Sequence, residues 1–209
     1  MKSIKLNLGC GQTGLEGWVN VDNSPSVFVS RVPFLRFVLY KLKIINEYSY
    51  RSVWLKNIIW RDLTKKLNWS DNSVDKIYNS HVLEHMENDK GKAFLKECYR
   101  VMKKDAIFRL VVPDLEFHCR RYLKKVEIGE SAGREAHDEL LFNVYGGYLN
   151  KRRYGAEHLY MYDWNTLRLL LTDIGFSQVI RQTYRKGVDN ELFLLDNRPE
   201  DSLHIDAIK

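Results

Sequence analysis

The segment Ile4–Asp22 constrains the fold of this chain more than any other feature. One apolar run ends in Gly9-Cys10-Gly11, and a second apolar run ends in Asp22. Because glycine has no Cβ and readily adopts positive φ, a Gly-x-Gly turn after a strand lets the backbone approach a ligand closely. A carboxylate at the end of the next strand can accept hydrogen bonds from ribose hydroxyls. The segment therefore predicts a nucleoside-binding edge on an α/β sheet.

The distance from the glycines to Asp22 favours one class of nucleoside cofactor. Gly9, Gly11 and Gly14 match G-x-G-x-x-G, but the acid of a dinucleotide fold lies about 20 residues further on, after a complete helix. Residues 12–17 are too few for such a helix, so the helix N-terminus that binds a pyrophosphate is weakened or missing. S-adenosylmethionine has a ribose and no phosphate. We therefore expect this cofactor, with a dinucleotide as the alternative.

Composition and charge exclude several other classes of protein. The 209 residues suit a single domain, no apolar stretch is long enough to span a bilayer, and the first residues lead into a strand rather than a signal peptide. Cys10, Cys98 and Cys119 are few and lack a zinc-binding spacing, as expected in a reducing compartment. The net charge of +6 fits an anionic substrate or surface but is too small to indicate nucleic acid. We therefore expect a cytoplasmic protein without a nucleic-acid partner.

Apolar runs alternate with helix-like segments along the chain. This alternation is typical of an α/β fold with a doubly wound, mostly parallel sheet. Strands are expected at Lys5–Leu8, Trp18–Val21, around Trp60, and at Val74–Asn79, Ala106–Val112, Phe176–Arg185 and Leu203–Lys209, with Glu191–Leu195 as a candidate partner of the last.

We expect one domain, 1–209, with two additions to the sheet. A helical lid insertion is expected at 27–59, and the glycine-containing stretch 129–162 is expected to be an irregular, substrate-covering segment. The predicted helices, with Asp89 and Asp163 as caps and Gly175 as a terminator, are Val27–Ile45, Tyr48–Ile59, Lys90–Lys103, Leu115–Val126 and Trp164–Ile174.

In this order, four landmarks resemble those of class I S-adenosylmethionine-dependent methyltransferases. They are LNLGCG with Asp22, Arg61-Asp62-Leu63, SHVLEH at Ser80–His85, and LVVPD at Leu110–Asp114. More narrowly, GWVNVD and the tail DNRPEDSLHIDAIK resemble predicted methyltransferases associated with bacterial surface-polysaccharide synthesis. The resemblance implies a Rossmann-like seven-stranded sheet of order 3-2-1-4-5-7-6. Strand seven would be antiparallel, with helices on both faces and the cofactor at the carboxyl edge.

The resemblance implies two groups of cofactor-binding residues, the first of which follows the first two strands. Gly9, Cys10 and Gly11 are implied to contact the methionine part of S-adenosylmethionine, and Asp22 to bind the ribose hydroxyls. Asp22 has an alternative role as a strand-end turn residue, because Asp-Asn-Ser-Pro is favourable turn chemistry.

The second implied group follows later strands. Asp62 and the backbone of Leu63 are implied at the adenine edge, although an Asp before Leu-Thr also suits a helix cap. Ser80 and His81, at the end of the central strand, are implied to lie beside the reactive methyl group.

Methyl transfer from a sulfonium is an in-line displacement, so much of the catalysis can come from holding the acceptor in line with the methyl group. A hydroxyl acceptor also needs a base, and imidazole is suited to that role near neutral pH. The candidates are His158, His85 and Asp114, with His158 favoured. His118 and His137 are expected to be surface or lid residues.

His81, Glu84 and His85 fall at i, i+3 and i+4, so one helical turn would place them on a common face. A metal site there would need a third ligand and an open coordination geometry. Because no recognisable ligand set lies nearby in the sequence, we expect no metal. His81 is then expected at the cofactor, and the other two residues at the substrate mouth.

Residues 27–45 combine apolar side chains with four basic residues and contain no acid. Basic amphipathic helices can bind an anionic membrane surface. The alternative, which we favour from the sequence, is a lid helix packed on the domain with its charges in solvent.

We expect the acceptor to be a hydroxyl of a sugar or glycan intermediate. Aromatic and basic side chains in 129–162 offer stacking and hydrogen bonds for such a substrate. Another small-molecule acceptor and a non-catalytic binding module of the same fold are the alternatives, and the oligomeric state is open. The side chains concerned are Tyr145, Tyr148, Lys151, Arg152, Arg153, Tyr154, Tyr160 and Tyr162.

Overall fold

The computed structural model describes residues 3–12, 14–52, 54–145, 157–198 and 201–209. Seven strands form one sheet in the order β3-β2-β1-β4-β5-β7-β6. Neighbouring strands are parallel except at β7, which is antiparallel to both β5 and β6, so the predicted order and orientation are confirmed. The strands are β1 (Lys5–Leu8), β2 (Val19–Asp22), β3 (Ile59–Trp60), β4 (Val74–Ser80), β5 (Met102–Pro113), β6 (Gln178–Gln182) and β7 (Ser202–Ile208).

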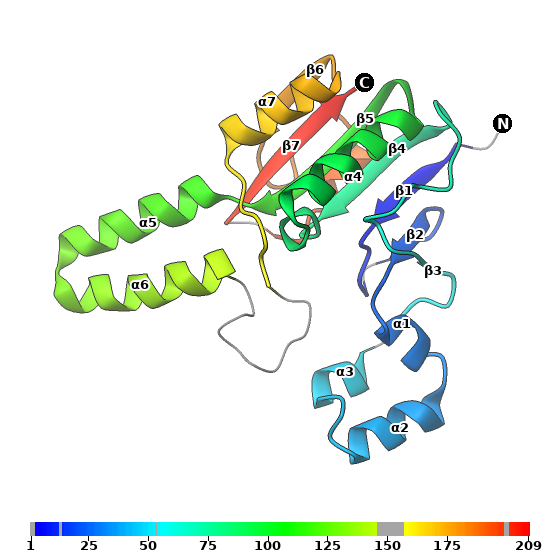
Figure 1. Cartoon of the computed structure of the whole chain (residues 1–209), viewed down its shortest axis with the longest axis horizontal. Helices are drawn as coiled ribbons and strands as arrows, with labels where there is room; N and C mark the ends of the chain where they lie inside the picture. Colours follow the sequence, from blue (N-terminus) through cyan, green and yellow to red (C-terminus); the bar gives the residue numbers. More distant parts are fainter. Residues whose placement is uncertain (1–2, 13, 53, 146–156, 199–200) are drawn as a thin grey trace.

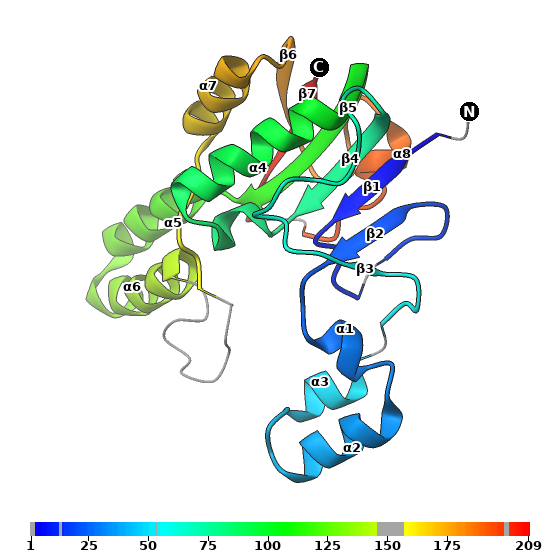
Figure 2. The same cartoon turned by 45° about the vertical axis from the view of Figure 1, so that its right-hand side comes forward.

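Helices cover both faces of the sheet, as predicted (Figures 1 and 2). On one face lie α4 (Asn88–Val101) and α7 (Trp164–Ile174), and on the other lies the short α8 (Asn190–Phe193). A hairpin of α5 (Leu115–Ile128) and α6 (Glu130–Tyr145) extends away from the sheet (Figure 1). The remaining helices, beyond the carboxyl ends of the first strands, are α1 (Ser26–Val29), α2 (Pro33–Lys41), α3 (Glu47–Arg51) and the 3-10 turn η1 (Leu83–His85).

The core follows from the alternation of side chains along each strand, because successive residues point to opposite faces of a sheet. Ile77 of β4 packs into the large apolar cluster that includes Phe94 of α4. Its neighbour Tyr78 packs on the opposite face with Leu192 of α8. Both faces are therefore closed by apolar contacts, which leaves the carboxyl edge of the sheet for a site. Among the described residues, no helix is long and apolar enough to cross a bilayer.

Residues 27–59 form shorter helices than predicted. The expected helix Val27–Ile45 is interrupted because Pro33 begins α2, and Val32 before it has the non-helical φ of −120° and ψ of 88°. The expected helix Tyr48–Ile59 is also wrong beyond Arg51, where α3 ends and the chain continues to β3. The function of this insertion as a lid stays a prediction.

Part of 129–162 is regular structure that we did not predict. Residues Glu130–Tyr145 form α6, and Gly129, with φ of 144°, makes the turn that precedes it. Gly133 lies inside the helix, where an added Cβ would stand 3.5 Å from Val126. This is an ordinary van der Waals distance, so Gly133 is a tolerated helix residue rather than the mark of an irregular segment. Residues 146–156 lie outside the described part of the chain, with five of the predicted substrate-binding side chains, Tyr148, Lys151, Arg152, Arg153 and Tyr154.

Three helix boundaries depended on capping residues. The expected strand Glu191–Leu195 is instead the region of α8, which begins because the side chain of Asp189 accepts two backbone hydrogen bonds. The expected cap Asp89 lies within the first turn of α4 rather than before it. Asp163 and Gly175 bound α7 as predicted, the latter with φ of 119°.

Candidate active site

The turn after β1 is held by the end of β2. The amides of Gly9 and Cys10 both donate to Val21 O, at 2.8 Å and 3.0 Å. Gly9 has φ of 76°, and an added Cβ would lie 2.1 Å from Val82 Cγ2. Gly9 therefore cannot carry a side chain in this conformation, because the backbone and the space are both restricted.

Asp22 fixes two backbone amides at the edge of the sheet. Its Oδ2 accepts from Gly11 N at 2.8 Å, and its Oδ1 accepts from Ser24 N at 2.7 Å. No helix occurs between β1 and β2 in the described residues, as the short spacing predicted. Asn20 instead fixes this connection through two hydrogen bonds to the backbone of Leu15, at 3.0 Å and 2.9 Å.

A pocket of about 620 Å³ opens at the carboxyl ends of β1 and β4. Its volume lies within the range of small-molecule sites. Five of the eight predicted cofactor-binding residues line it: Gly9, Cys10, Gly11, Ser80 and His81. His85, a predicted base candidate, also lines the pocket. Ten further lining residues were not predicted and come from separate segments: Asn7, Gln12, Ser24, Ser26, Ser49, Ser52, Trp54, Tyr78, Asn197 and Arg198.

Three predicted cofactor-binding residues are not among those that line the pocket. Asp22 adjoins it through the amides of Gly11 and Ser24, both of which do line it. Asp62 accepts from the backbone and the hydroxyl of Thr64, and the hydroxyl hydrogen bond lowers the pKa of the Asp62 carboxyl. The Leu63 side chain is buried in the core. Their contact with the adenine edge stays a prediction.

Cys10 contributes its backbone rather than its thiol to the pocket. The side chain is buried in a small cluster with Val27 and Ile58. Burial, reinforced by the negative charge of Asp22, raises the pKa of the thiol to about 12. The group is therefore a neutral packing element at physiological pH and is not a nucleophile.

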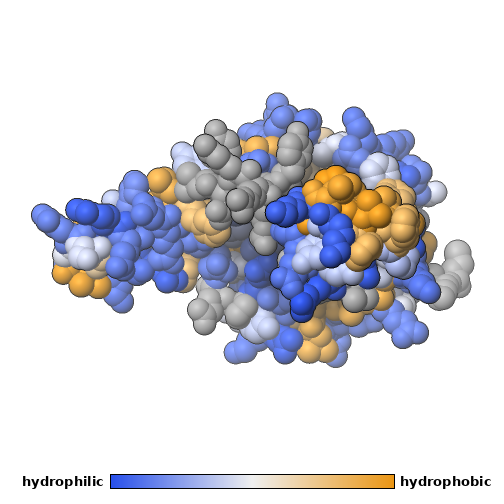
Figure 3. Space-filling view, turned by 90° about the horizontal axis from the view of Figure 1, so that it is seen from below, coloured by the Kyte–Doolittle hydropathy of each residue, from blue (hydrophilic) through white to orange (hydrophobic). Residues whose placement is uncertain are grey.

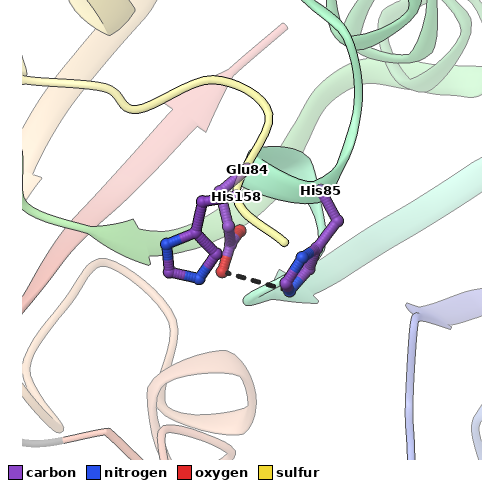
Figure 4. Close-up of side chains that lie close together, drawn as sticks. All are labelled: Glu84, His85 and His158. Atoms are coloured by element: carbon purple, nitrogen blue, oxygen red, sulfur yellow. Dashed lines mark ion pairs between the residues drawn. The ribbon is translucent and has the colours of Figure 1, made fainter. Parts of the chain in front are cut away.

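Glu84 of η1 is the centre of a buried polar cluster beside the pocket (Figure 4). Its side chain is 1% exposed, with His81 Nδ1 3.2 Å and His85 Nε2 3.9 Å from Oε1. Within the described part of the chain, neither carboxylate oxygen has a hydrogen-bond partner, because His81 is close but not aligned for one. Burial alone would raise the pKa of Glu84, but the neighbouring imidazoles outweigh this effect and lower it. His81 itself has φ of 54°, an uncommon conformation for a residue with a side chain.

His158 joins this cluster from a segment that is distant in the sequence. The amides of Leu159 and Tyr160 donate to Glu84 O at 2.7 Å and 3.2 Å, which fixes the segment on η1. The rings of His158 and His85 then lie 5.1 Å apart (Figure 4). Burial lowers the pKa of His158, so its imidazole is neutral near physiological pH. The structure therefore brings together two of the three predicted base candidates, an encounter that the sequence did not predict.

The third base candidate lies elsewhere. Asp114 Oδ1 accepts from Glu116 N and Phe117 N at the start of α5, and its Oδ2 pairs with Arg181 at 3.0 Å. The carboxylate thus caps α5 and forms an ion pair with β6, and Asp114 is not among the residues that line the pocket. His118, expected at the surface or in a lid, is buried on α5, whereas His137 is exposed as expected.

Comparisons with known proteins agree with this geometry. Residues 43–110 match a family described as a methyltransferase domain. The structure is similar to an S-adenosylmethionine-dependent methyltransferase from Archaeoglobus fulgidus, with a TM-score of 0.53, 17% identity, and coverage of 99% of this chain and 86% of that one. It is also similar to a methyltransferase from Thermotoga maritima described as a possible histamine N-methyltransferase, with a TM-score of 0.52, 16% identity, and coverage of 100% and 83%. No curated protein sequence matches the chain.

The sheet order is that of Rossmann-like methyltransferases, with the glycine turn at the carboxyl edge, and residues 43–110 match a methyltransferase domain. The chain therefore has the fold of class I S-adenosylmethionine-dependent methyltransferases.

Proposed function

We propose that this chain is an S-adenosylmethionine-dependent methyltransferase that methylates a hydroxyl group of a sugar or glycan intermediate. The observation that carries the proposal is the pair of imidazoles beside the donor pocket. His85 lines the pocket, and His158 packs against it. A hydroxyl acceptor must lose a proton as it is methylated, whereas the donor pocket itself offers mainly amides, hydroxyls and backbone groups.

The donor site fits S-adenosylmethionine by its shape. The glycine turn exposes backbone to the pocket because Gly9 packs directly on Val82, and Gly11 N is oriented by Asp22. We assign the methionine part to Gly9, Cys10, Gly11, Ser80 and His81, and the ribose to Asp22. S-adenosylmethionine supplies a sulfonium-bound methyl group and leaves as S-adenosylhomocysteine.

The two imidazoles are held in the form that accepts a proton. Nδ1 of His85 lies 2.8 Å from Glu157 O, and Nδ1 of His158 lies 2.7 Å from Asn143 O. Because a carbonyl only accepts, each Nδ1 carries the hydrogen and each Nε2 has a free lone pair. In the proposed reaction the acceptor oxygen bonds to the methyl carbon, the carbon–sulfur pair returns to sulfur, and the hydroxyl proton passes to Nε2.

Labelled methyl transfer tests the proposed acceptor class. The chain is incubated with S-adenosylmethionine labelled in the methyl group and with matched panels of sugars, nucleotide sugars, amines and carboxylic acids. We expect methyl ethers of sugar hydroxyls by mass spectrometry, and a loss of at least about a hundredfold in turnover for His158→Ala with unchanged donor binding. Methylation confined to amines or acids would contradict the sugar proposal. Donor binding without transfer to any class would favour a binding module.

We also propose that 27–45 contacts an anionic membrane surface, which would suit a lipid-linked glycan. The structure does not bury the apolar face of α2, although we favoured a packed lid helix from the sequence. Figure 3 shows apolar side chains gathered at this end of the molecule. The segment contains no acid, and its cations are Arg31, Arg36, Lys41 and Lys43. The apolar side chains that are at least two-fifths exposed are Phe28, Val32, Phe34, Leu35, Phe37, Leu42 and Ile44.

Liposome flotation tests the membrane contact. We expect the chain to float with vesicles rich in phosphatidylserine at low salt and to remain behind with neutral vesicles. The double variant Phe34→Ser and Leu42→Ser should lose flotation, whereas Ile128→Ser, which removes an exposed apolar side chain from α5, should not. Absence of flotation at low salt would overturn the proposal. A cytoplasmic location is likewise proposed, supported by the free thiols of Cys98 and Cys119.

A further inference from the structure

We propose that Glu84, His85 and His158 bind one divalent transition-metal ion at the edge of the donor pocket. One ligand atom from each of the three side chains lies within 4.8 Å of the others (Figure 4). We expected no metal from the sequence because no third ligand lay near Glu84 and His85. His158 supplies that ligand in space, from a segment distant in the chain.

The first observation is a buried carboxylate that accepts no hydrogen bond. Glu84 is 1% exposed, and both its carboxylate oxygens are without hydrogen bonds among the residues described. A buried carboxylate in this condition is costly unless a cation or several donors compensate it. His81 and His85 are near but do not align hydrogen bonds with it. A cation between Glu84 and the two histidine rings would compensate the charge directly.

The second observation is the way the two histidines are held. Each gives its Nδ1 hydrogen to a backbone carbonyl, Glu157 O for His85 and Asn143 O for His158. This arrangement is characteristic of metal-binding histidines, because it fixes the ring and directs the Nε2 lone pair to the ion. The two Nε2 atoms and a Glu84 oxygen therefore form a set of three oriented ligands. Metal–ligand bonds of about 2.0–2.2 Å at tetrahedral angles place the ligand atoms about 3.3–3.6 Å apart, so the side chains must close by about an ångström.

The ligand types select the kind of ion. Two imidazoles and one carboxylate suit zinc, manganese, iron or cobalt in the divalent state, whereas calcium and magnesium favour sets made of oxygen. Three protein ligands leave coordination positions open for a substrate oxygen. Because His85 also lines the donor pocket, such a substrate oxygen would lie near the transferred methyl group.

The chemical role of the ion rests on the proposed O-methylation, but its binding does not. A hydroxyl bound to the ion has a lowered pKa, so its proton can pass to water before the oxygen attacks the methyl carbon. The carbon–sulfur electron pair returns to sulfur, as before. With the ion bound, Nε2 of His158 is a ligand and does not serve as the base. The two roles of His158 are therefore distinguishable.

Metal binding to the purified full chain tests the proposal without any acceptor. The chain is treated with a chelator, dialysed, and titrated with Zn²⁺ and Mn²⁺ by calorimetry, with metal content measured separately by mass spectrometry. We expect about one ion per chain. His158→Ala and Glu84→Gln should each weaken binding by more than about tenfold. The control His137→Ala, which removes an exposed imidazole paired with Asp138, should bind like the original chain.

Two results would overturn the metal site: the absence of saturable binding, or equal binding by the original chain and His158→Ala. Retained S-adenosylmethionine binding shows that a variant is folded. If Glu84→Gln no longer binds S-adenosylmethionine, the test rests on His158→Ala, because the His158 side chain lies outside the sheet. If the metal fails to bind but His158→Ala still abolishes sugar methylation, the metal site is wrong and the proposed base survives. If the metal binds but no hydroxyl is methylated, the metal site is right and the proposed O-methylation is wrong.

Discussion

Arg109 and Glu84 are both fully buried charges, and their surroundings are opposite. The guanidinium of Arg109 donates to Asp196 at 2.5 Å, to Asp206 at 3.0 Å and to Thr183 O at 3.2 Å. The Glu84 carboxylate receives no hydrogen bond from any described residue. A satisfied buried charge holds strands and loops in one arrangement, whereas an unsatisfied one is a strained element that a ligand can relieve. The difference separates the part of the polar interior that maintains the fold from the part available for chemistry.

The largest effect expected from this comparison is on Asp196. Asp196→Ala leaves the Arg109 guanidinium with an uncompensated charge, so we expect a loss of about 3–5 kcal/mol in the free energy of unfolding, measured by urea denaturation. The matched control is Glu191→Ala, a carboxylate that pairs with Lys5 and Lys76 at the surface. It should cost less than about 1 kcal/mol. Similar costs for the two variants would show that Arg109 does not depend on its partners.

Asp22 lies between the two extremes, since its carboxylate is partly exposed and is satisfied by two backbone amides. Asp22→Asn removes a charged acceptor from the turn and from the predicted ribose site. We expect S-adenosylmethionine binding, measured by calorimetry, to weaken by about ten- to a hundredfold. Asp62→Asn should weaken binding less, because Asp62 bonds to Thr64 and does not line the pocket. An equal loss would reverse this ranking and support the predicted adenine contact.

Glu84→Gln should cost less than Asp196→Ala. In the presence of a chelator it removes a buried carboxylate that accepts no hydrogen bond and is faced only by imidazoles, so the loss in the free energy of unfolding should be the smaller of the two. Denaturation of the metal-free chain measures this change. A loss as large as that for Asp196→Ala would mean that Glu84, like Arg109, maintains the fold.

The smallest effect concerns pH. Burial lowers the pKa of His204, next to Asp196, and of His118 on α5, each from an ordinary value of 6.5. The unfolded chain then binds protons at a pH where these folded residues do not, so the free energy of unfolding should fall as pH decreases through about 6.5 towards the lowered values. Denaturation between about pH 7.5 and 5.5 measures the slope. His204→Gln should flatten it, whereas the exposed His137→Gln should not; identical slopes would contradict the assignment.

Features set by neighbouring residues were predictable from the sequence. The first strand, the missing crossover helix and both ends of α7 depend on apolar runs, glycines and capping residues that lie close together in the chain. The errors also had local causes. Gly129 and Gly133 suggested an irregular segment, but a single glycine can equally form a turn between helices or lie inside one. Pro33 was the overlooked signal for the break between α1 and α2.

The candidate site was only half predictable for the same reason. The glycine turn uses backbone groups of consecutive residues, so a single short stretch of the sequence predicts it. The cluster of Glu84, His85 and His158 forms because backbone hydrogen bonds from Leu159 and Tyr160 hold a distant segment against η1. A contact between such distant segments produces no periodic pattern in the sequence. A lone histidine in a variable segment therefore gave no signal that it would meet a buried carboxylate.

The position of β7 between β5 and β6 has a consequence for synthesis on the ribosome. Strand β6 joins the sheet only through β7, and Asp206 of β7 is one of the two carboxylates that compensate Arg109. Until residues 202–208 have been translated, β5 presents an unpaired edge, and β6 has no place in the sheet. Nascent chains that stop short of β7 therefore expose backbone groups that can pair with other chains, which makes them candidates for chaperone capture rather than for early folding.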